Sequence, residues 1–103
     1  MSLIWHDKAW EEYIDWQTTD KKLLKQINRL ITDIQRNGNT VGIGNPEPLK
    51  GNLSGYYSRH ISGENRLIYR VRDEGTLEII SCKTQYKLLT KSPRFKSGGF
   101  QLV

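Results

Sequence analysis

Apolar positions recur with a helical period over two stretches in the first half of the sequence. The first stretch follows Asp7, an expected N-cap, and carries large side chains at i, i+3, i+4 and i+7. The second begins at Asp20 and carries a broader apolar stripe that stops at Asn37 and Gly38. A short loop separates the two stretches, which predicts two amphipathic helices in an antiparallel hairpin. The stripes consist of Trp10, Tyr13 and Ile14 in the first helix and of Leu23, Leu24, Ile27, Leu30, Ile31 and Ile34 in the second. The aromatic side chains Trp10 and Tyr13 are expected to pack against the second helix rather than to stack on bases.

Strand-like segments flank this hairpin. A short apolar run precedes the first helix, and three segments with side chains of alternating character follow the second, separated by turn residues. These segments predict an α+β fold in which three strands are joined by hairpin connections. The segments are residues 3–5, 56–61, 66–72 and 77–83.

Alternation on the segment 66–72 divides its side chains between two faces of a sheet. One set is apolar and is expected to face the helices: Leu67, Tyr69 and Val71. The other set contains three arginines and is expected on an open face: Arg66, Ile68, Arg70 and Arg72. Arginines on an exposed sheet face are typical of a phosphate-binding surface.

Composition narrows the class of protein. With 103 residues, of which 36% are hydrophobic and 26% charged, the chain is large enough for one folded domain with a single core. The net charge of +5 lies in the second half, because residues 1–45 balance six basic against six acidic side chains. A basic surface attracts polyanions such as RNA. The sequence has no apolar run typical of a membrane span or signal peptide, so we expect a cytoplasmic protein without a membrane. The single cysteine, Cys82, is expected to be a buried strand residue, and no metal or cofactor motif is present.

The most distinctive chemistry is a carboxylate fixed between two prolines. Pro46 and Pro48 restrict the backbone on either side of Glu47, which predicts a stiff, extended segment. The two segments that follow carry several cations, so the region suits an anionic substrate. The alternative is a turn whose glutamate is only solvated. The cationic residues are Arg59, His60, Arg66 and Arg70.

The same region resembles a known family. The run PEPLKGNLSGYYSRHISGENRLIYRV, the opening LIW and the segment WEEYIDWQTTDKK are similar to the YoeB branch of the RelE-like bacterial toxins. The resemblance implies a RelE-like α+β fold, in which an N-terminal strand and an antiparallel two-helix hairpin accompany a four- to five-stranded, mostly antiparallel sheet. It implies one toxin domain over residues 1–86, and it implies an endoribonuclease that cuts messenger RNA on the ribosome.

The resemblance also implies roles for particular residues. Metal-free cleavage needs a base for the 2′-hydroxyl, positive charge for the phosphate and an acid for the leaving oxygen. Glu47 matches the family's base and Arg66 its phosphate-binding arginine. Further positive charge for RNA binding is expected from Lys50, Arg59, His60, Arg70 and Lys83.

The sequence departs from the family at the position of the acid. Where the family ends near a His-Tyr pair, this chain has Gln85 and Tyr86, and glutamine has no proton to donate. Tyr86 is then the first candidate acid and His60 the second. An even-numbered loop through Gly63 would pair Arg66 with Ile61 and turn His60 to the opposite face. The alternative function is a catalytically impaired toxin-like module that binds its antitoxin or the ribosome without turnover. A ribosome-independent ribonuclease is a further alternative.

Partners follow from the resemblance as well. A cognate YefM/Phd-like antitoxin, the ribosome and mRNA are implied, with operator DNA contacted only through the antitoxin complex; members also form homodimers. The basic extension 87–103, with four Lys/Arg and no acidic residue, has no counterpart in the family. It is interpreted as a solvated extension, an additional arm for ribosomal RNA or a clip over the site.

Overall fold

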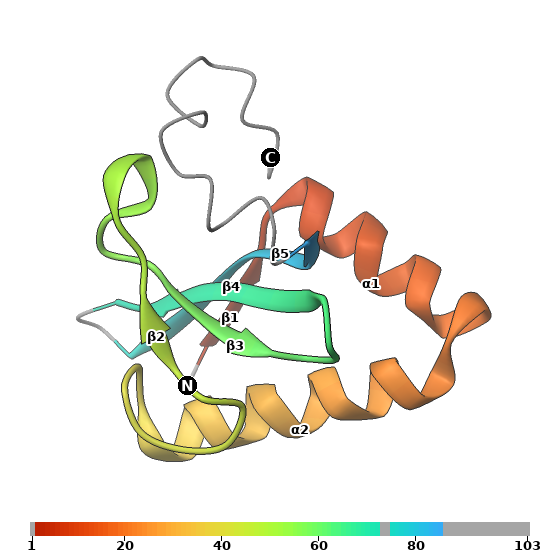
Figure 1. Ribbon diagram of the computed structural model, residues 1–103, viewed down its shortest axis with the longest axis horizontal. Coiled ribbons are helices and arrows are strands. Elements are labelled where there is room, and N and C mark those ends of the chain that lie inside the picture. The colour runs from red at the N-terminus through yellow and green to blue at the C-terminus, as the bar shows by residue number, and fades with distance from the viewer. Residues whose placement is uncertain (1, 73–74, 86–103) are drawn as a thin grey trace.

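The computed structural model describes residues 2–72 and 75–85 of the chain. In this part, strand β1 (Ser2–Trp5) is followed by helices α1 (Asp7–Thr19) and α2 (Lys21–Asn37). The chain then forms the short strand β2 (Glu47–Pro48), the 3₁₀ turn η1 (Gly51–Leu53), and strands β3 (Tyr57–His60), β4 (Asn65–Val71) and β5 (Thr76–Gln85) (Figure 1). The predicted α+β fold is confirmed, with β2 as a strand that the sequence pattern did not reveal.

The described strands form one mixed sheet in the order β1-β5-β4-β3-β2. Strand β1 runs parallel to β5, with Ser2 opposite Thr76, and the other neighbours are antiparallel. The pairing of β4 with β5 contains two register shifts, around Ile68, which bend and twist the sheet locally. The N-terminal strand is therefore held by the last strand of the described chain.

Helix α2 begins and ends where the sequence predicts. The Asp20 carboxylate accepts hydrogen bonds from the backbone amides of Lys22 and Leu23, as an N-cap does. At the other end Gly38 has a φ of 86°, and its amide donates to the carbonyl of Ile34. The apolar face of α2 packs on the sheet, and the core includes Ile27, Leu30, Ile31, Ile34, Leu67, Tyr69, Leu77 and Ile79.

Helix α1 lies beside β5 where β1 has ended. The Glu12 carboxylate accepts the Cys82 amide at 2.8 Å, and Trp16 Nε1 donates to the Cys82 carbonyl at 2.9 Å. Glu12 and Trp16 therefore occupy backbone groups that a neighbouring strand would otherwise bind. Burial, followed by the nearby Glu12 charge, raises the pKa of the Cys82 thiol to about 12, as fits the expected buried cysteine.

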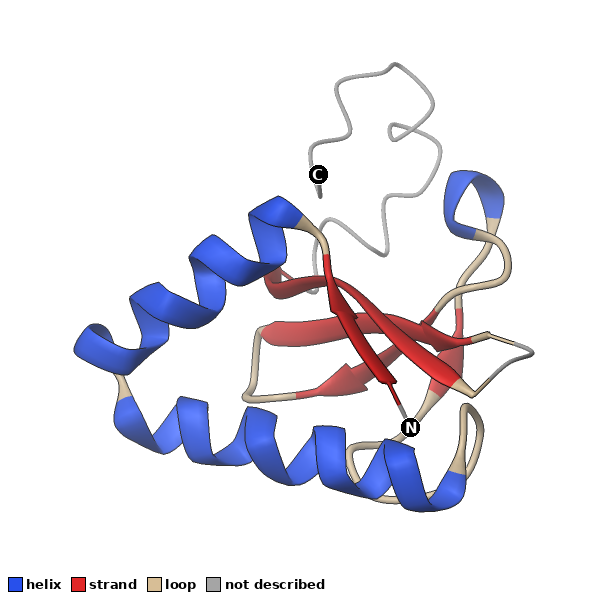
Figure 2. Ribbon diagram, turned by 180° about the vertical axis from the view of Figure 1, so that it is seen from behind, coloured by secondary structure: helices blue, strands red, loops and turns tan. Residues whose placement is uncertain are grey.

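Two expectations for α1 are wrong. His6, not Asp7, precedes the first helical residue, and its side chain makes no capping hydrogen bond. Trp10 is 47% exposed; it meets the Trp5 ring edge to face and stacks with Tyr13 instead of packing on α2. Tyr13 does reach α2, where its hydroxyl donates to Asn28. The two helices meet at their short turn as a V, with the sheet between its arms (Figure 2).

The face of the sheet turned away from α2, here called the outer face, is partly covered. Segment 49–56 folds back over it, and Leu53 packs with Ile68 and Ile80 in a second, smaller core. Leu49 and Tyr56 border this core. The expected alternation on β4 is confirmed, because Leu67 and Tyr69 lie in the α2 core and Ile68 lies on the outer face.

Candidate active site

Glu47 lies on the edge strand β2, opposite Ser58 of β3, and Ser58 in turn lies opposite Ile68 of β4. Directly paired residues share one face of a sheet, so Glu47 is on the outer face with Ile68. Its side chain is exposed, whereas Ser58 beside it is buried. The structure therefore places this carboxylate at the border between solvent and the outer face.

The next row of the sheet brings His60 and Arg66 together. His60 lies directly opposite Arg66, and Arg66 lies opposite Thr84 of β5. The expected pairing of Arg66 with Ile61 is wrong. The connection between the two paired residues spans 61–65, and the amides of Ile61 and Ser62 both point at the Asn65 carbonyl. This odd-numbered loop keeps His60 on the same face as Arg66, two residues along β3 from the row that contains Glu47.

Arg66 is buried, with 3% of its surface exposed, although the sequence predicted an exposed arginine. Its Nη1 atom donates to the carbonyls of Ser62, Gly63 and Asn65 at 3.1 to 3.2 Å. The hairpin loop turns these carbonyls inward over the strand end, and the guanidinium satisfies them. A phosphate that replaced such neutral acceptors would gain a stronger, charge-assisted contact.

The structure places Arg59 away from the other residues predicted to bind RNA. Its side chain is fully buried on the α2 side of the sheet, because Arg59 pairs with Leu67 of β4, which lies in the core under α2. Its guanidinium donates to the Asp33 carboxylate, the Tyr69 hydroxyl and three loop carbonyls, those of Gly38, Val41 and Ile43. All five N–H groups are thereby used.

The partners of Arg59 make it the anchor of the loop that leads to Glu47. Asp33 also accepts the Ile43 amide, and Tyr69 donates to the Asn39 carbonyl. Burial opposes the charged form of Asp33, but the hydrogen bonds from Arg59 and the Ile43 amide hold its pKa below the usual value. Gly42 fits closely here, because a Cβ atom on it would collide with the Asp33 carboxylate. Asp33 and Tyr69 were not predicted as parts of the site, because in the sequence Asp33 is only an acid beside an apolar helical stripe and Tyr69 only a tyrosine among core positions.

Arg70 belongs to a second ionic cluster on the outer face. Its Nε donates to Glu78 at 2.8 Å, Arg72 Nε donates to the same oxygen at 3.2 Å, and His6 Nε2 lies 2.6 Å from the other oxygen. Arg70 also lies over the Tyr56 ring. Burial disfavours the Glu78 charge, yet the His6 and Arg70 contacts lower its pKa. The positive charge of Arg70 is thus largely matched within the protein.

Two further lysines were predicted to bind RNA, Lys50 and Lys83, and the structure places only Lys50 near Glu47. Lys50 is exposed at the start of η1, beside the β2 segment that carries Glu47. Lys83 instead forms an ion pair with Asp15 of α1 at 2.5 Å and lies over the Trp16 ring. Lys50 fits the candidate site, whereas Lys83 connects α1 to β5.

Gln85 ends β5 opposite Asn65, next to the row of His60 and Arg66. Tyr86 and the extension 87–103 lie outside the described residues. The structure therefore brings the end of β5, where the family's acid is expected, to the strand end that carries Arg66.

The described residues contain no cluster of three or more His, Cys, Asp or Glu side chains that would hold a metal ion. None of the helices in residues 2–72 and 75–85 is long and apolar enough to cross a membrane. A shallow cavity of about 440 Å³ lies elsewhere, on the outer side of α2 beside Ile43.

This fold and site define a class of small α+β toxins, and comparison with known proteins names the family. Residues 5–86 match the family described as YoeB-like toxin of bacterial type II toxin-antitoxin system. The chain is 49% identical over 86 residues to Toxin YoeB of Escherichia coli, which covers 84% of this chain and 100% of that toxin. The chain belongs to the YoeB-like toxin family.

Solved structures agree with this assignment. The YoeB dimer from Staphylococcus aureus superposes with a TM-score of 0.78 at 48% identity, covering 84% of this chain and 98% of that chain. The toxin in the heterotetrameric YoeB-YefM toxin-antitoxin complex from the same organism gives the same TM-score, identity and coverage. The predicted RelE-like fold is confirmed.

Proposed function

We propose that this chain is a ribosome-dependent mRNA endoribonuclease, acting as the toxin of a type II toxin-antitoxin pair. Its substrate is the phosphodiester next to a ribose 2′-hydroxyl. Attack by the 2′-oxygen on phosphorus breaks the bond to the 5′-oxygen and leaves a 2′,3′-cyclic phosphate. No metal is required in this scheme, because proton transfer and charge stabilisation come from side chains.

The observation that carries the proposal is the strand register. Glu47 and the His60–Arg66 pair occupy adjacent rows of one sheet face. A carboxylate, an imidazole and a guanidinium on one face supply the three kinds of group that cleavage requires. Glu47 is the base for the 2′-hydroxyl, and Arg66 binds the phosphate after its guanidinium exchanges loop carbonyls for phosphate oxygens.

The same register strengthens His60 as the acid. Imidazole titrates near neutral pH, whereas a tyrosine donates with an ordinary pKa of about 10 and glutamine does not donate at all. His60 lies directly opposite the residue that holds the phosphate. We therefore place His60 beside Tyr86 as a candidate donor to the 5′-oxygen.

A specific observation favours the second candidate function, a module that binds without turnover. Gln85 stands where the family carries its acid, and the Arg66 guanidinium is turned onto the carbonyls of its own hairpin. A site in this state would bind an antitoxin or a ribosome while cleaving poorly or not at all.

The proposed partners follow from the family. An antitoxin of the YefM/Phd kind binds the toxin in the cytoplasm and bridges it to operator DNA, and the ribosome presents the mRNA. The basic second half of the chain complements an acidic antitoxin segment. A homodimer is proposed on the same basis, because a YoeB relative has been solved as a dimer.

Primer extension on an mRNA being translated by purified ribosomes tests the proposal. The native protein should produce cuts in the codon at the decoding site, and Glu47→Ala should reduce them about 10²- to 10⁴-fold, as expected for loss of a general base. Glu64→Ala is the matched control, since Glu64 is also exposed but lies in the hairpin loop. Equal cleavage by both variants would remove Glu47 from the mechanism. No cuts by the native protein would favour the binding module, and cuts in naked RNA would show ribosome independence.

A further inference from the structure

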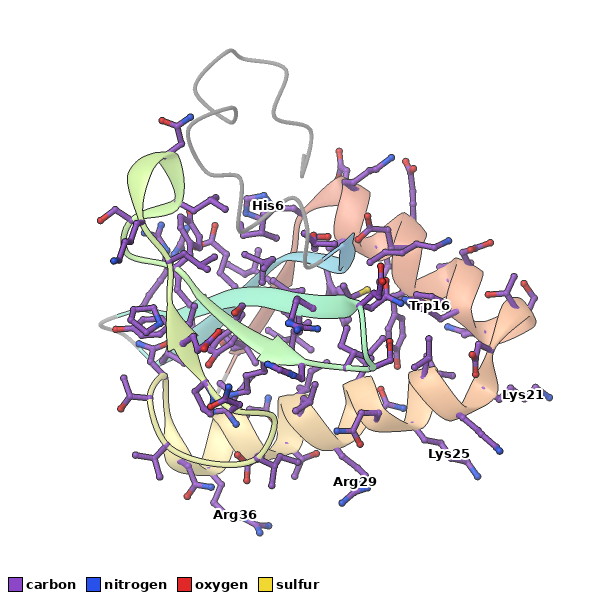
Figure 3. All side chains as sticks on the ribbon, viewed as in Figure 1. His6, Trp16, Lys21, Lys25, Arg29 and Arg36 are labelled. Atoms are coloured by element: carbon purple, nitrogen blue, oxygen red, sulfur yellow. The ribbon has the colours of Figure 1, made fainter. Side chains whose placement is uncertain are left out.

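Four basic side chains form a row along the outer side of α2: Lys21, Lys25, Arg29 and Arg36 (Figure 3). Their spacings of four, four and seven residues keep them within one side of a helix that turns 100° per residue. Figure 3 shows all four directed away from the sheet. We call this row the α2 basic stripe.

The stripe is built on a rigid support. The opposite side of α2 contributes fully buried side chains to the core, including Ile27, Leu30 and Ile34. Both helix ends are fixed, by the Asp20 cap and by the Gly38 stop. The basic side chains therefore project from a helix that is held in place by the core.

The charge of the stripe is not neutralised within the described protein. No ion pair in residues 2–72 and 75–85 involves any of its four members. Asp33, the acidic residue of α2, is instead turned to Arg59 and to the Ile43 amide. Four cations of the sheet do form ion pairs. Arg59 pairs with Asp33, Arg70 and Arg72 both pair with Glu78, and Lys83 pairs with Asp15. The stripe thus differs from the paired cations of the sheet.

The cavity of about 440 Å³ lies beside the C-terminal half of the stripe, between Arg29 and Arg36. Asn28, Arg29, Thr32, Asp33, Arg36 and Ile43 line it. Thr32 lies three residues after Arg29 and four before Arg36, so its hydroxyl stands beside both guanidinium groups on the helix surface, with the Asn28 amide one turn away. These are the side-chain types that contact phosphate and sugar in nucleic-acid complexes.

We propose that the α2 basic stripe binds the phosphate backbone of an RNA segment other than the one cleaved. The stripe and Glu47 lie on opposite sides of the sheet, because α2 covers the face away from Glu47. Neighbouring stripe residues four apart lie about 6 Å apart along the helix, and the stripe extends over about 22 Å. That length matches on the order of six nucleotides of a helical strand. The inference rests on the proposed ribonuclease function, since that function makes a structured RNA the polyanion at hand.

RNA fits the stripe better than an acidic antitoxin segment does. A disordered segment that folds on binding needs apolar surface to compensate for its ordering. The stripe offers amides and hydroxyls between its charges, and the exposed apolar side chains nearest to it, Val41 and Ile43, belong to the loop that follows α2. An exposed apolar surface lies instead around β1 and α1, at Leu3, Ile4, Trp10 and Ile14.

The test measures binding to a 20-base-pair RNA duplex that is fully 2′-O-methylated and cannot be cleaved through its 2′-oxygens. Fluorescence anisotropy from 50 to 300 mM KCl gives the slope of log K against log salt for the full-length protein. Replacing all four stripe residues by Gln should lower the magnitude of the slope by about 3 and weaken binding at least tenfold at 100 mM KCl, since each phosphate contact contributes about 0.9. Gln has a helix propensity close to Lys and Arg, so circular dichroism should remain unchanged.

Two controls separate position from charge. Lys25→Gln should lower the slope by about 1, whereas Lys8→Gln, the same change at an exposed position of α1, should leave it unchanged. Exchanging Lys for Arg and Arg for Lys throughout the stripe should preserve binding. A parallel titration with a 20-residue polyglutamate peptide probes the acidic polypeptide.

Each outcome has one reading. An unchanged slope in the fourfold Gln variant would overturn the inference, and loss of polyglutamate binding with an unchanged RNA slope would identify an acidic-peptide surface instead. Glu47→Ala should bind the duplex like the native protein. Absence of cleavage in the ribosome assay would therefore count against the proposed function. Whether the α2 basic stripe binds RNA is decided only by the salt slope of duplex binding.

Discussion

The two faces of the sheet use arginine in opposite ways. On the face covered by α2, Arg59 is fully buried and bonded to a carboxylate, a hydroxyl and three carbonyls from the loop after α2. On the outer face, Arg66 donates to three carbonyls of its own hairpin, and it lies one row of the sheet away from the exposed Glu47. Arg59 holds the backbone that leads to Glu47, whereas Arg66 donates to loop carbonyls that phosphate oxygens would replace in the proposed mechanism. The position of a residue along the strand decides which role it has.

The largest effect should come from breaking the covered face. Arg59→Ala leaves the Asp33 carboxylate and several loop carbonyls without their donor and should lower the free energy of unfolding by about 3 to 5 kcal/mol. Arg66→Ala removes hydrogen bonds to three neutral carbonyls at a hairpin end, so it should cost about 1.5 kcal/mol, less than Arg59→Ala, but should abolish cleavage. Urea denaturation of both variants, followed by tryptophan fluorescence, measures the difference. Equal losses of stability would show that the two faces do not differ as described.

A smaller effect is expected from restoring a histidine at the position where the family carries its acid. Gln85→His introduces a titratable acid at the end of β5, beside the row of His60 and Arg66, and should raise cleavage about 10²-fold, near the low end for general acid catalysis. The primer-extension assay measures the gain, and the rate should fall above the pKa of the new imidazole. His60→Gln in the native background shows whether His60 already acts as the acid. If Gln85→His gives no gain and the native protein does not cleave, the binding module is the better description.

The smallest effect concerns the charge of Asp33. Its pKa is lower in the folded protein than its ordinary value, so its contribution to stability is present above the unfolded pKa of about 3.8 and is lost as pH falls through the folded pKa. Asp33→Asn should remove about 1 to 2 kcal/mol at pH 7 and flatten the dependence of stability on pH below about 4. Thermal unfolding between pH 2.5 and 7 measures both. A variant that keeps the native acid dependence would assign that dependence to another group, such as Glu78.

The features that were predicted correctly from the sequence depend on residues close together in the chain. The stripe from Leu23 to Ile34, the Asp20 cap and the alternation of Leu67, Ile68 and Tyr69 all appear as expected, because each is set by side chains close together in the chain. Trp10 was predicted wrongly, because the spacing of apolar residues in a helix does not determine which other element they pack against.

The candidate site was less predictable because it depends on register. The sequence pattern singled out Glu47 and Arg66, and the resemblance implied their roles. The pairing of His60 with Arg66, however, depends on an odd-numbered loop that no residue type in 61–65 demands. The burial of Arg59 follows from its partner Asp33, 26 residues away in the chain. A contact between residues so far apart in the chain cannot be predicted from the pattern of a single sequence.

The parallel pairing of β1 with β5 also determines when the sheet can form during synthesis of the chain. Residue 2 pairs with residue 76, and the row of His60 and Arg66 is completed by Thr84 of the same strand. At about 5 to 20 residues per second, the ribosome makes β5 roughly 4 to 15 s after β1. During that interval the helical hairpin has its local contacts, but β1 has no strand to join and Arg66 has no neighbour on its second side. The nascent chain thus acquires its complete outer face only after almost the whole described sequence has been made.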